Sequence, residues 1–328
     1  MKSLVLLLSV GVFFNVFASG SRAADKNKSK ALAHYTMGII YDNKGQPNLA
    51  VSEYRESLRH DPHSTLARLR LGVDYLALEE EKKAVKEFEL IEKIDPENKQ
   101  ATFILALVYT SRGDLASAEK KYKTLIKGGF ADTGIYITLA YVYIQGEKYE
   151  EALKLLDVVL AENPENVSAY FYKGVVYERK SSEKKDMEAK RKAEENFRKA
   201  ISLDPHLAEA YNYLGYIFAE EGRNLDEAVL FTKKAVELDP ENAAYIDSLG
   251  WAYFKKGMTQ KALEELKKAA SIAKEDPAIR EHLGDAYFEE GLPDKARIQW
   301  EKALELDPGK KNIRKKIQLL KAEKEGAR

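Results

Sequence analysis

The stretch Leu71-Gly72-Val73-Asp74-Tyr75 is followed by Ala84-Val85-Lys86-Glu87-Phe88 and then by Asp95-Pro96. A small residue and an aromatic residue stand three positions apart in the first segment, and an alanine and an aromatic residue stand four apart in the second. Such spacings place side chains on one face of a helix, and proline cannot continue a helix. The stretch therefore predicts two helices joined by a short turn.

The same pattern recurs along the chain, which makes it an internal repeat. The small residues are Gly38, Gly72, Ala106, Ala140, Gly174, Gly215, Gly250 and Gly284. The alanines of the second segment are Ala50, Ala84, Ala118, Ala152, Ala193, Ala228, Ala262 and Ala296. A large residue usually follows four positions after the alanine, although Thr232 breaks this rule. We therefore predict eight helix hairpins.

The glycines indicate how each hairpin packs. Glycine within a helix costs about 1 kcal/mol relative to alanine, so its recurrence at one position implies that the second helix crosses too closely for a side chain. The recurring alanine would supply the matching gap. Because one hairpin cannot bury its apolar face alone, neighbouring hairpins must stack on one another.

These residues predict the organisation of the whole chain. Residues 24–30 are expected to form a linker, and residues 31–310 eight repeats, the fifth enlarged by seven residues. Residues 311–328 are expected to form a capping helix and a basic tail, with Ile313, Ile317 and Leu320 on the buried side. The basic residues of this tail favour a solvated outer face, and a contact with anionic lipid or another polyanion is the alternative.

The pattern resembles the tetratricopeptide repeat family, whose 34-residue consensus has Leu-Gly-x-x-Tyr in the first helix and Ala-x-x-x-Phe with a closing proline in the second. The resemblance covers about residues 31–310. It implies an all-α fold, a right-handed superhelical solenoid of eight hairpins that ends in the capping helix. It also implies a protein that binds other proteins.

Composition excludes several other functions. The 53 Lys and Arg residues balance 53 Asp and Glu residues, so a nucleic-acid partner is not expected. The chain has no cysteine, which excludes disulfides and thiolate metal sites. No motif for a phosphate loop, a dinucleotide site, a zinc protease or a serine hydrolase is found. We therefore expect no catalytic residues, no metal and no cofactor, and the five scattered histidines are not expected to form a site.

The N-terminus differs from the rest. Lys2 precedes an uncharged apolar run from Leu4 to Phe17, and Ser21 and Ala23 are small residues suited to cleavage. Residues 1–23 therefore predict a secretory signal peptide cleaved near Ala23, with an uncleaved N-terminal anchor as the alternative. With no second run long enough to span a bilayer, we expect a bacterial periplasmic protein with at most peripheral membrane association.

The first helices of the repeats are expected to line a concave groove. Helical spacing places one set of positions on that face. The predicted partner-binding residues are Tyr35, Ile39, Leu69, Val73, Phe103, Leu107, Ile137, Tyr141, Tyr216 and Trp251. The N-terminal half of the groove is apolar, whereas the C-terminal half has acidic residues, such as Glu281 and Asp285, between aromatic ones. Packing between repeats is the alternative role of each apolar position.

We therefore expect a non-enzymatic scaffold of the bacterial cell envelope that binds a partner protein or peptide in the groove. The alternative is a glycan-binding adaptor of a polysaccharide export system, in which aromatic side chains stack on sugar rings. Those aromatic residues are Tyr141, Phe171, Tyr216, Trp251, Phe254 and Phe288.

Overall fold

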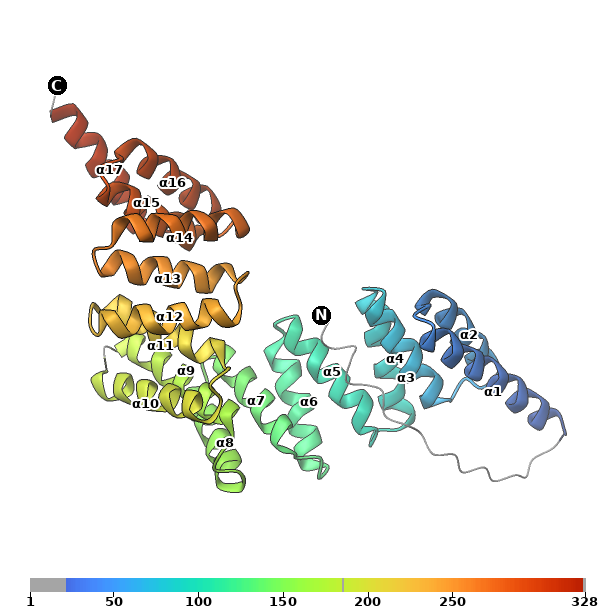
Figure 1. Cartoon of the computed structure of the whole chain (residues 1–328). Coiled ribbons are helices and arrows are strands. Elements are labelled where there is room, and N and C mark those ends of the chain that lie inside the picture. Colours follow the sequence, from blue (N-terminus) through green and yellow to red (C-terminus); the bar gives the residue numbers. More distant parts are fainter. Residues whose placement is uncertain (1–21, 185, 327–328) are drawn as a thin grey trace. The chain divides into compact units, whose positions relative to one another are not determined.

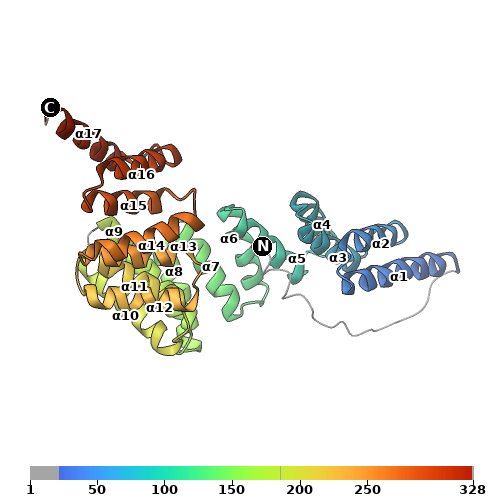
Figure 2. The ribbon, with the colours of Figure 1, turned by 45° about the horizontal axis from the view of Figure 1, so that its top comes forward.

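The computed structural model describes residues 22–184 and 186–326, which form seventeen α-helices and no strand. Figures 1 and 2 show these helices as successive antiparallel pairs. The first helices of the pairs are α1 (Arg22–Asn43), α3 (Thr65–Ala77), α5 (Lys99–Ser111), α7 (Thr133–Gln145), α9 (Val167–Lys184), α11 (Ala208–Glu221), α13 (Ala243–Lys255) and α15 (Pro277–Glu289). The second helices are α2 (Pro47–His60), α4 (Glu81–Ile94), α6 (Leu115–Lys127), α8 (Tyr149–Glu162), α10 (Met187–Leu203), α12 (Leu225–Leu238), α14 (Thr259–Ile272) and α16 (Pro293–Leu306), and α17 (Lys311–Gly326) follows them. The predicted all-α solenoid is confirmed.

The chain divides into two compact bodies between Leu155 and Leu156, inside α8. We call the parts before and after this point the N-terminal body and the C-terminal body. In the C-terminal body, α9 has 18 residues and α10 has 17 residues, whereas α11 and α12 have 14 each. The extra residues of the fifth repeat therefore lengthen both of its helices.

The beginning of the chain differs from expectation at one point. The signal-peptide prediction falls largely on residues 1–21, outside the described residues. Residues 24–30, expected to be a linker, belong to α1, which begins at Arg22. The segment Ala23 to Ala31 contains no glycine or proline, and alanine and lysine favour the helix, so nothing in it stops α1 from extending toward the N-terminus.

The Asp-Pro steps end one hairpin and start the next. Asp95 caps the end of α4, and its carboxylate accepts a 3.1 Å hydrogen bond from the side chain of Asn98. Asn98 in turn accepts a 3.0 Å hydrogen bond from the backbone N–H of Ala101, in the first turn of α5. Because proline follows Asp95, the helix cannot continue, and the capping side chain fixes where the next one begins.

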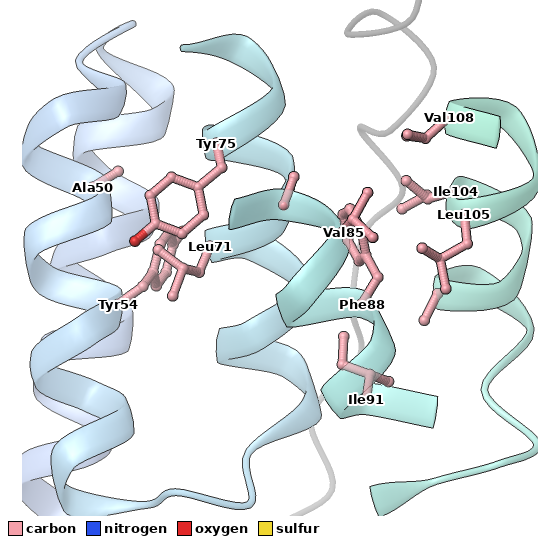
Figure 3. Packing of buried hydrophobic residues seen from close by; sticks show 12 residues of the cluster. Ala50, Tyr54, Leu71, Tyr75, Val85, Phe88, Ile91, Ile104, Leu105 and Val108 are labelled. Atoms are coloured by element: carbon pink, nitrogen blue, oxygen red, sulfur yellow. The ribbon is translucent and has the colours of Figure 1, made fainter. Parts of the chain in front are cut away.

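Every repeat glycine except Gly215 faces a large side chain of the second helix. A Cβ atom added to Gly72 would lie 2.6 Å from the ring of Phe88, and one added to Gly174 would lie 2.7 Å from the ring of Phe197. Figure 3 shows Phe88 among the buried residues of the N-terminal body. The expectation that the second helix leaves no room for a side chain at this position is therefore confirmed. The large residue four positions after the alanine occupies the space, and glycine is needed because that side chain lies flat on the helix.

In repeat 6 the glycine of the first helix contacts a small side chain and the backbone of the second helix. A Cβ atom on Gly215 would meet the Cγ2 atom of Thr232 at 2.7 Å and the backbone oxygen of Ala228 at 3.0 Å. Thr232 is fully buried, and its hydroxyl donates a 2.8 Å hydrogen bond to the Ala228 oxygen. A small side chain here lets the two helix backbones approach closely.

Consecutive repeats are linked by ion pairs between residues 29 positions apart. Such pairs contribute little stability singly, since exposed ion pairs are worth about 0–1 kcal/mol, but their spacing matches the register of the stack. They join Glu92 to Lys121, Glu119 to Lys148, Glu194 to Arg223, Arg198 to Glu227 and Glu281 to Lys310.

Helix α17 covers the end of the C-terminal body. Ile313, Ile317 and Leu320 are buried, and the two isoleucines pack with Trp300 and Ala303 of α16. The sequence analysis favoured a solvated face for the basic residues of this segment, but not all of them are solvated. Lys316 contacts Asp285 at 2.7 Å and Glu281 at 3.1 Å, both on α15. Part of the basic tail therefore neutralises carboxylates of its own chain.

Two carboxyl groups meet in the first two hairpins. Tyr54, whose ring covers Gly38, donates a 2.5 Å hydrogen bond to the Oδ2 atom of Asp42. The Oδ1 atom of Asp42 and the Oδ2 atom of Asp74 are buried and have no hydrogen-bond partner. Burial and the neighbouring Asp42 raise the pKa of Asp74 to about 8, against the partial opposition of Arg70. A proton on Asp74 supplies the donor that these two oxygens lack.

This pair predicts a pH-dependent stability. Because the pKa of Asp74 is raised on folding, the native state holds an extra proton between about pH 4 and pH 8, so stability falls as pH rises through this window. We expect Asp74→Asn to remove this dependence and to stabilise the N-terminal body at pH 8 by about 1–3 kcal/mol, since it removes an unpaired buried carboxylate. Urea unfolding at about pH 5 and pH 8 measures the effect.

The exposed Glu97 provides the control. Glu97→Gln should leave the pH profile unchanged, and Asp42→Asn should flatten it only in part, because burial alone still raises the pKa of Asp74. A wild-type stability that rises between these pH values, or an Asp74→Asn variant with the wild-type slope, would contradict the proton on Asp74.

Candidate protein-binding groove

The predicted groove residues of the N-terminal body lie half-buried on four successive first helices. These residues are Tyr35 and Ile39 of α1, Leu69 and Val73 of α3, Phe103 and Leu107 of α5, and Ile137 and Tyr141 of α7. Two further apolar residues stand one turn before the first two pairs, where Leu32 is 51% exposed and Leu66 is 48% exposed. Each first helix therefore presents apolar surface at the same helical phase.

Four of the predicted groove residues also contact the core. Tyr35, Ile39, Leu69 and Val73 pack against the buried cluster that contains Tyr54, Leu71 and Phe88. Side chains held in this way lose little rotamer entropy when a ligand covers their remaining surface. These four residues therefore pack within the body and keep part of their surface exposed, and their role in binding a partner stays a prediction.

Tyr109, which stands at a position that defines the repeat, differs from the predicted groove residue Phe103. It packs against the same cluster, and its hydroxyl donates a 3.3 Å hydrogen bond to Glu89 of α4. Burial and the nearby carboxylates, Glu89 foremost, raise its pKa. Phe103, six residues earlier in α5, has no such polar partner to satisfy and keeps part of its ring exposed.

Trp251 does not line the groove as expected. Its side chain is 8% exposed, its ring lies 4.9 Å from Phe254 and 4.1 Å from His282, and its Nε1–H donates to Glu220 of α11. Trp251 is large and finds both stacking and hydrogen-bond partners between repeats, which explains its burial. It therefore belongs to the packing of the C-terminal body.

Tyr216 is half-buried on α11 beside a hollow of about 430 Å³. Glu178, Ser181, Lys190 and Glu220 also line this hollow. Burial, then the negative charges of Glu220 and Asp247, raise the pKa of the Tyr216 hydroxyl. Tyr216 thus lies in a more polar setting than the predicted groove residues of the N-terminal body, and its role in a groove stays a prediction.

The acidic side chains expected in the C-terminal half of the groove largely bind other groups of the same chain. Glu281 accepts from Lys310 at 2.7 Å, and Asp285 accepts a 2.9 Å hydrogen bond from Trp300 besides its contact with Lys316. Burial alone would raise the pKa of Glu281, but its interactions with Lys310 and Lys316 lower it below the usual value. The acidic positions therefore anchor the last repeat and α17.

Most of the aromatic residues named for the glycan-binding alternative also pack against other side chains of the chain. Phe171 packs against Phe197 and Tyr213, and Trp251 is buried as described. Phe288 remains 44% exposed. The described residues thus do not form a continuous row of open aromatic faces of the kind that sugar rings require.

Two histidines have partners that sequence reasoning missed. His34 lies 2.7 Å from Glu53 and stacks on His60, and His282 lies 2.9 Å from Asp247. The residues in each ion pair come from different helices, so only the helix packing brings them together. Over the described residues, no group of three or more His, Cys, Asp or Glu side chains is placed to hold a metal ion. In the same residues, no helix combines the length and the apolarity needed to span a bilayer.

Comparisons with known proteins agree with this architecture. Residues 77–319 match the family model of the "Cilia and flagella-associated protein 70 C-terminal domain", and residues 35–99 match the model "Tetratricopeptide repeat". The TPR repeat-containing protein YsoA of Bacillus subtilis is 28% identical over 170 residues, covering 50% of this chain and 49% of that protein. The protein O-mannosyl-transferase TMTC1 of Homo sapiens is 22% identical over 238 residues, covering 72% of this chain and 26% of that protein. The chain thus spans at most about half the length of these two relatives.

A solved structure shows the same fold. The crystal structure of a tetratricopeptide repeat protein from Parabacteroides merdae superposes with a TM-score of 0.53 at 17% identity, covering 89% of this chain and 99% of the other. Tetratricopeptide repeat domains generally bind protein partners. Together with the repeated hairpins and the match over residues 77–319, these findings show that the chain belongs to the tetratricopeptide repeat family.

Proposed function

We propose that this chain is a non-enzymatic scaffold that binds a segment of another protein along the first-helix face of its N-terminal body. The observation that supports this function is the set of eight half-buried apolar residues on α1, α3, α5 and α7. Because they recur at one helical phase on successive hairpins, they suit an amphipathic helix or an extended segment with apolar side chains at regular spacing.

We further propose that the scaffold acts in the bacterial cell envelope. This proposal rests on the sequence of residues 1–23, where a short apolar run precedes small residues. The envelope partner would then meet the groove outside the cytoplasm.

Export has a direct test. We expect the protein recovered from the envelope fraction of its native cells to begin near Ala24, because cleavage near Ala23 removes the apolar run. N-terminal sequencing of that protein measures the site. A protein that retains Met1 in a soluble cytoplasmic fraction would contradict the envelope proposal, although the groove proposal would stand.

The groove is tested by matched substitutions. Leu69→Ala and Phe103→Ala each remove an apolar side chain from the groove. Leu49→Ala and Phe130→Ala remove the same side chains from exposed positions outside it, where Leu49 on α2 is 47% exposed and Phe130 before α7 is 37% exposed. We expect the groove variants to bind a partner from envelope extracts about thirtyfold more weakly, since truncating a central anchor costs about 2 kcal/mol or more, and the control variants to bind as the wild type does.

Helicity and melting temperature must match the wild type before binding is compared, because Leu69 also packs against the core. The effect is measured by quantitative capture of the same protein with all five forms of the chain. Groove variants that fold normally and capture that protein as well as the wild type does would contradict the proposed site.

A further inference from the structure

A buried ion pair joins repeats 7 and 8 of the C-terminal body. The Nδ1 atom of His282, on α15, lies 2.9 Å from Oδ2 and 3.1 Å from Oδ1 of Asp247, on α13. The side chains of His282 and Asp247 are only 12% and 10% exposed. The imidazole also lies almost parallel to the indole of Trp251, with ring centroids 4.1 Å apart and an interplanar angle of 17°. One histidine thus makes both a polar and a stacking contact across the boundary between two repeats.

No other pair of consecutive repeats has an acid and a histidine at these two positions. Where repeat 7 has Asp247, the first four repeats have Tyr35, Leu69, Phe103 and Ile137. These apolar residues need no charged partner to be buried. A buried ion pair contributes less to stability than a well-packed apolar contact would, so the pair at this boundary is better explained by its response to protonation.

We propose that Asp247, Trp251 and His282 form a proton-controlled latch, in which protonated His282 holds α15 against α13 and deprotonated His282 loosens that contact. The latch lies between first helices, so its state sets how firmly the first-helix face of the last repeats is held. Through the hydrogen bond from Trp251 to Glu220 it also reaches α11.

The charges around His282 favour its protonated form. Helix α13 contributes Asp247, and α15 itself contributes Glu281 and Asp285. Lys310 is bound to Glu281, and Lys316 of α17 is bound to both Glu281 and Asp285. Helices α14 and α16 contact α15 through apolar side chains, among them Leu263 and Trp300. Burial alone lowers the pKa of His282, but the adjacent carboxylate of Asp247, with Asp285 and Glu281, raises it above its usual value.

The sign of the pH dependence follows from this geometry. A histidine whose pKa is raised on folding stabilises the native state at low pH, and this contribution is lost as pH rises through the pKa of the folded protein. Deprotonation leaves Asp247 buried with only a neutral N–H donor. The contact between α13 and α15 should therefore weaken above the ordinary histidine pKa of about 6.5.

Trp251 makes the latch visible by fluorescence. A protonated imidazole quenches an adjacent indole more strongly than a neutral one, and Trp300 is the only other tryptophan of the chain. In a Trp300→Phe background, we expect the emission of Trp251 to rise with pH between about pH 6 and pH 9, with a midpoint above about 6.5. His282→Gln should abolish this transition, and Asp247→Asn should lower its midpoint by about one pH unit or more.

His34→Gln is the matched control, because His34 pairs with Glu53 in the other body and should leave the Trp251 transition unchanged. Hydrogen exchange measures the latch itself. After correction for intrinsic rates, the amides of α15 should lose protection above the midpoint in the wild type, and their protection should not depend on pH in His282→Gln.

A variant that fails to fold does not end the test, since the C2 proton of His282 can be titrated by NMR in the wild-type chain. A folded-state pKa at or below about 6.5, or α15 protection that is the same on both sides of the midpoint, would overturn the proposal. The first result would leave His282 uncharged at neutral pH, and the second would make the pair a fixed packing contact.

Discussion

The structure depends on one contact that recurs in its hairpins, between a small residue of the first helix and a large side chain of the second. Phe88 on Gly72, Phe197 on Gly174 and Trp300 on Gly284 are examples. The bulk of the ring sets the distance and the angle between the two helices, and the missing side chain of glycine lets the ring lie against the helix. In these hairpins the contact positions the apolar face that one hairpin offers to the next, so the stacking of these repeats follows from it.

The two bodies use their first helices differently. In the N-terminal body the outer positions are apolar and partly exposed, as at Leu66 and Leu69. In the C-terminal body the corresponding positions are engaged by hydrogen bonds, ion pairs and stacked rings, as at Asp247 and Glu281. A partner protein would therefore gain most from covering the N-terminal positions, whereas the C-terminal positions hold neighbouring repeats together.

Sequence periodicity predicted the hairpins and the shared helical phase of the half-buried apolar residues, because each depends on the 3.6-residue repeat of a single helix. It failed where two hairpins meet. The partners of His282 and Asp285 lie 35 and 31 residues away in sequence, and their meeting depends on how one hairpin is rotated on the next. The burial of Trp251 was misjudged for the same reason, since a pattern gives the face of a residue but not the side chain opposite it.

A double-mutant cycle on Gly72 and Phe88 tests the central contact most directly. A Cβ atom on Gly72 would meet the Phe88 ring, so Gly72→Ala should destabilise the chain by about 1–3 kcal/mol in urea unfolding. Gly146→Ala, whose added Cβ atom has no neighbour nearer than 3.5 Å, should have little effect. In a Phe88→Ala background the cost of Gly72→Ala should fall by about 1 kcal/mol or more, because the side chain that the added Cβ atom would meet is gone. Purely additive effects of the two substitutions would contradict the account.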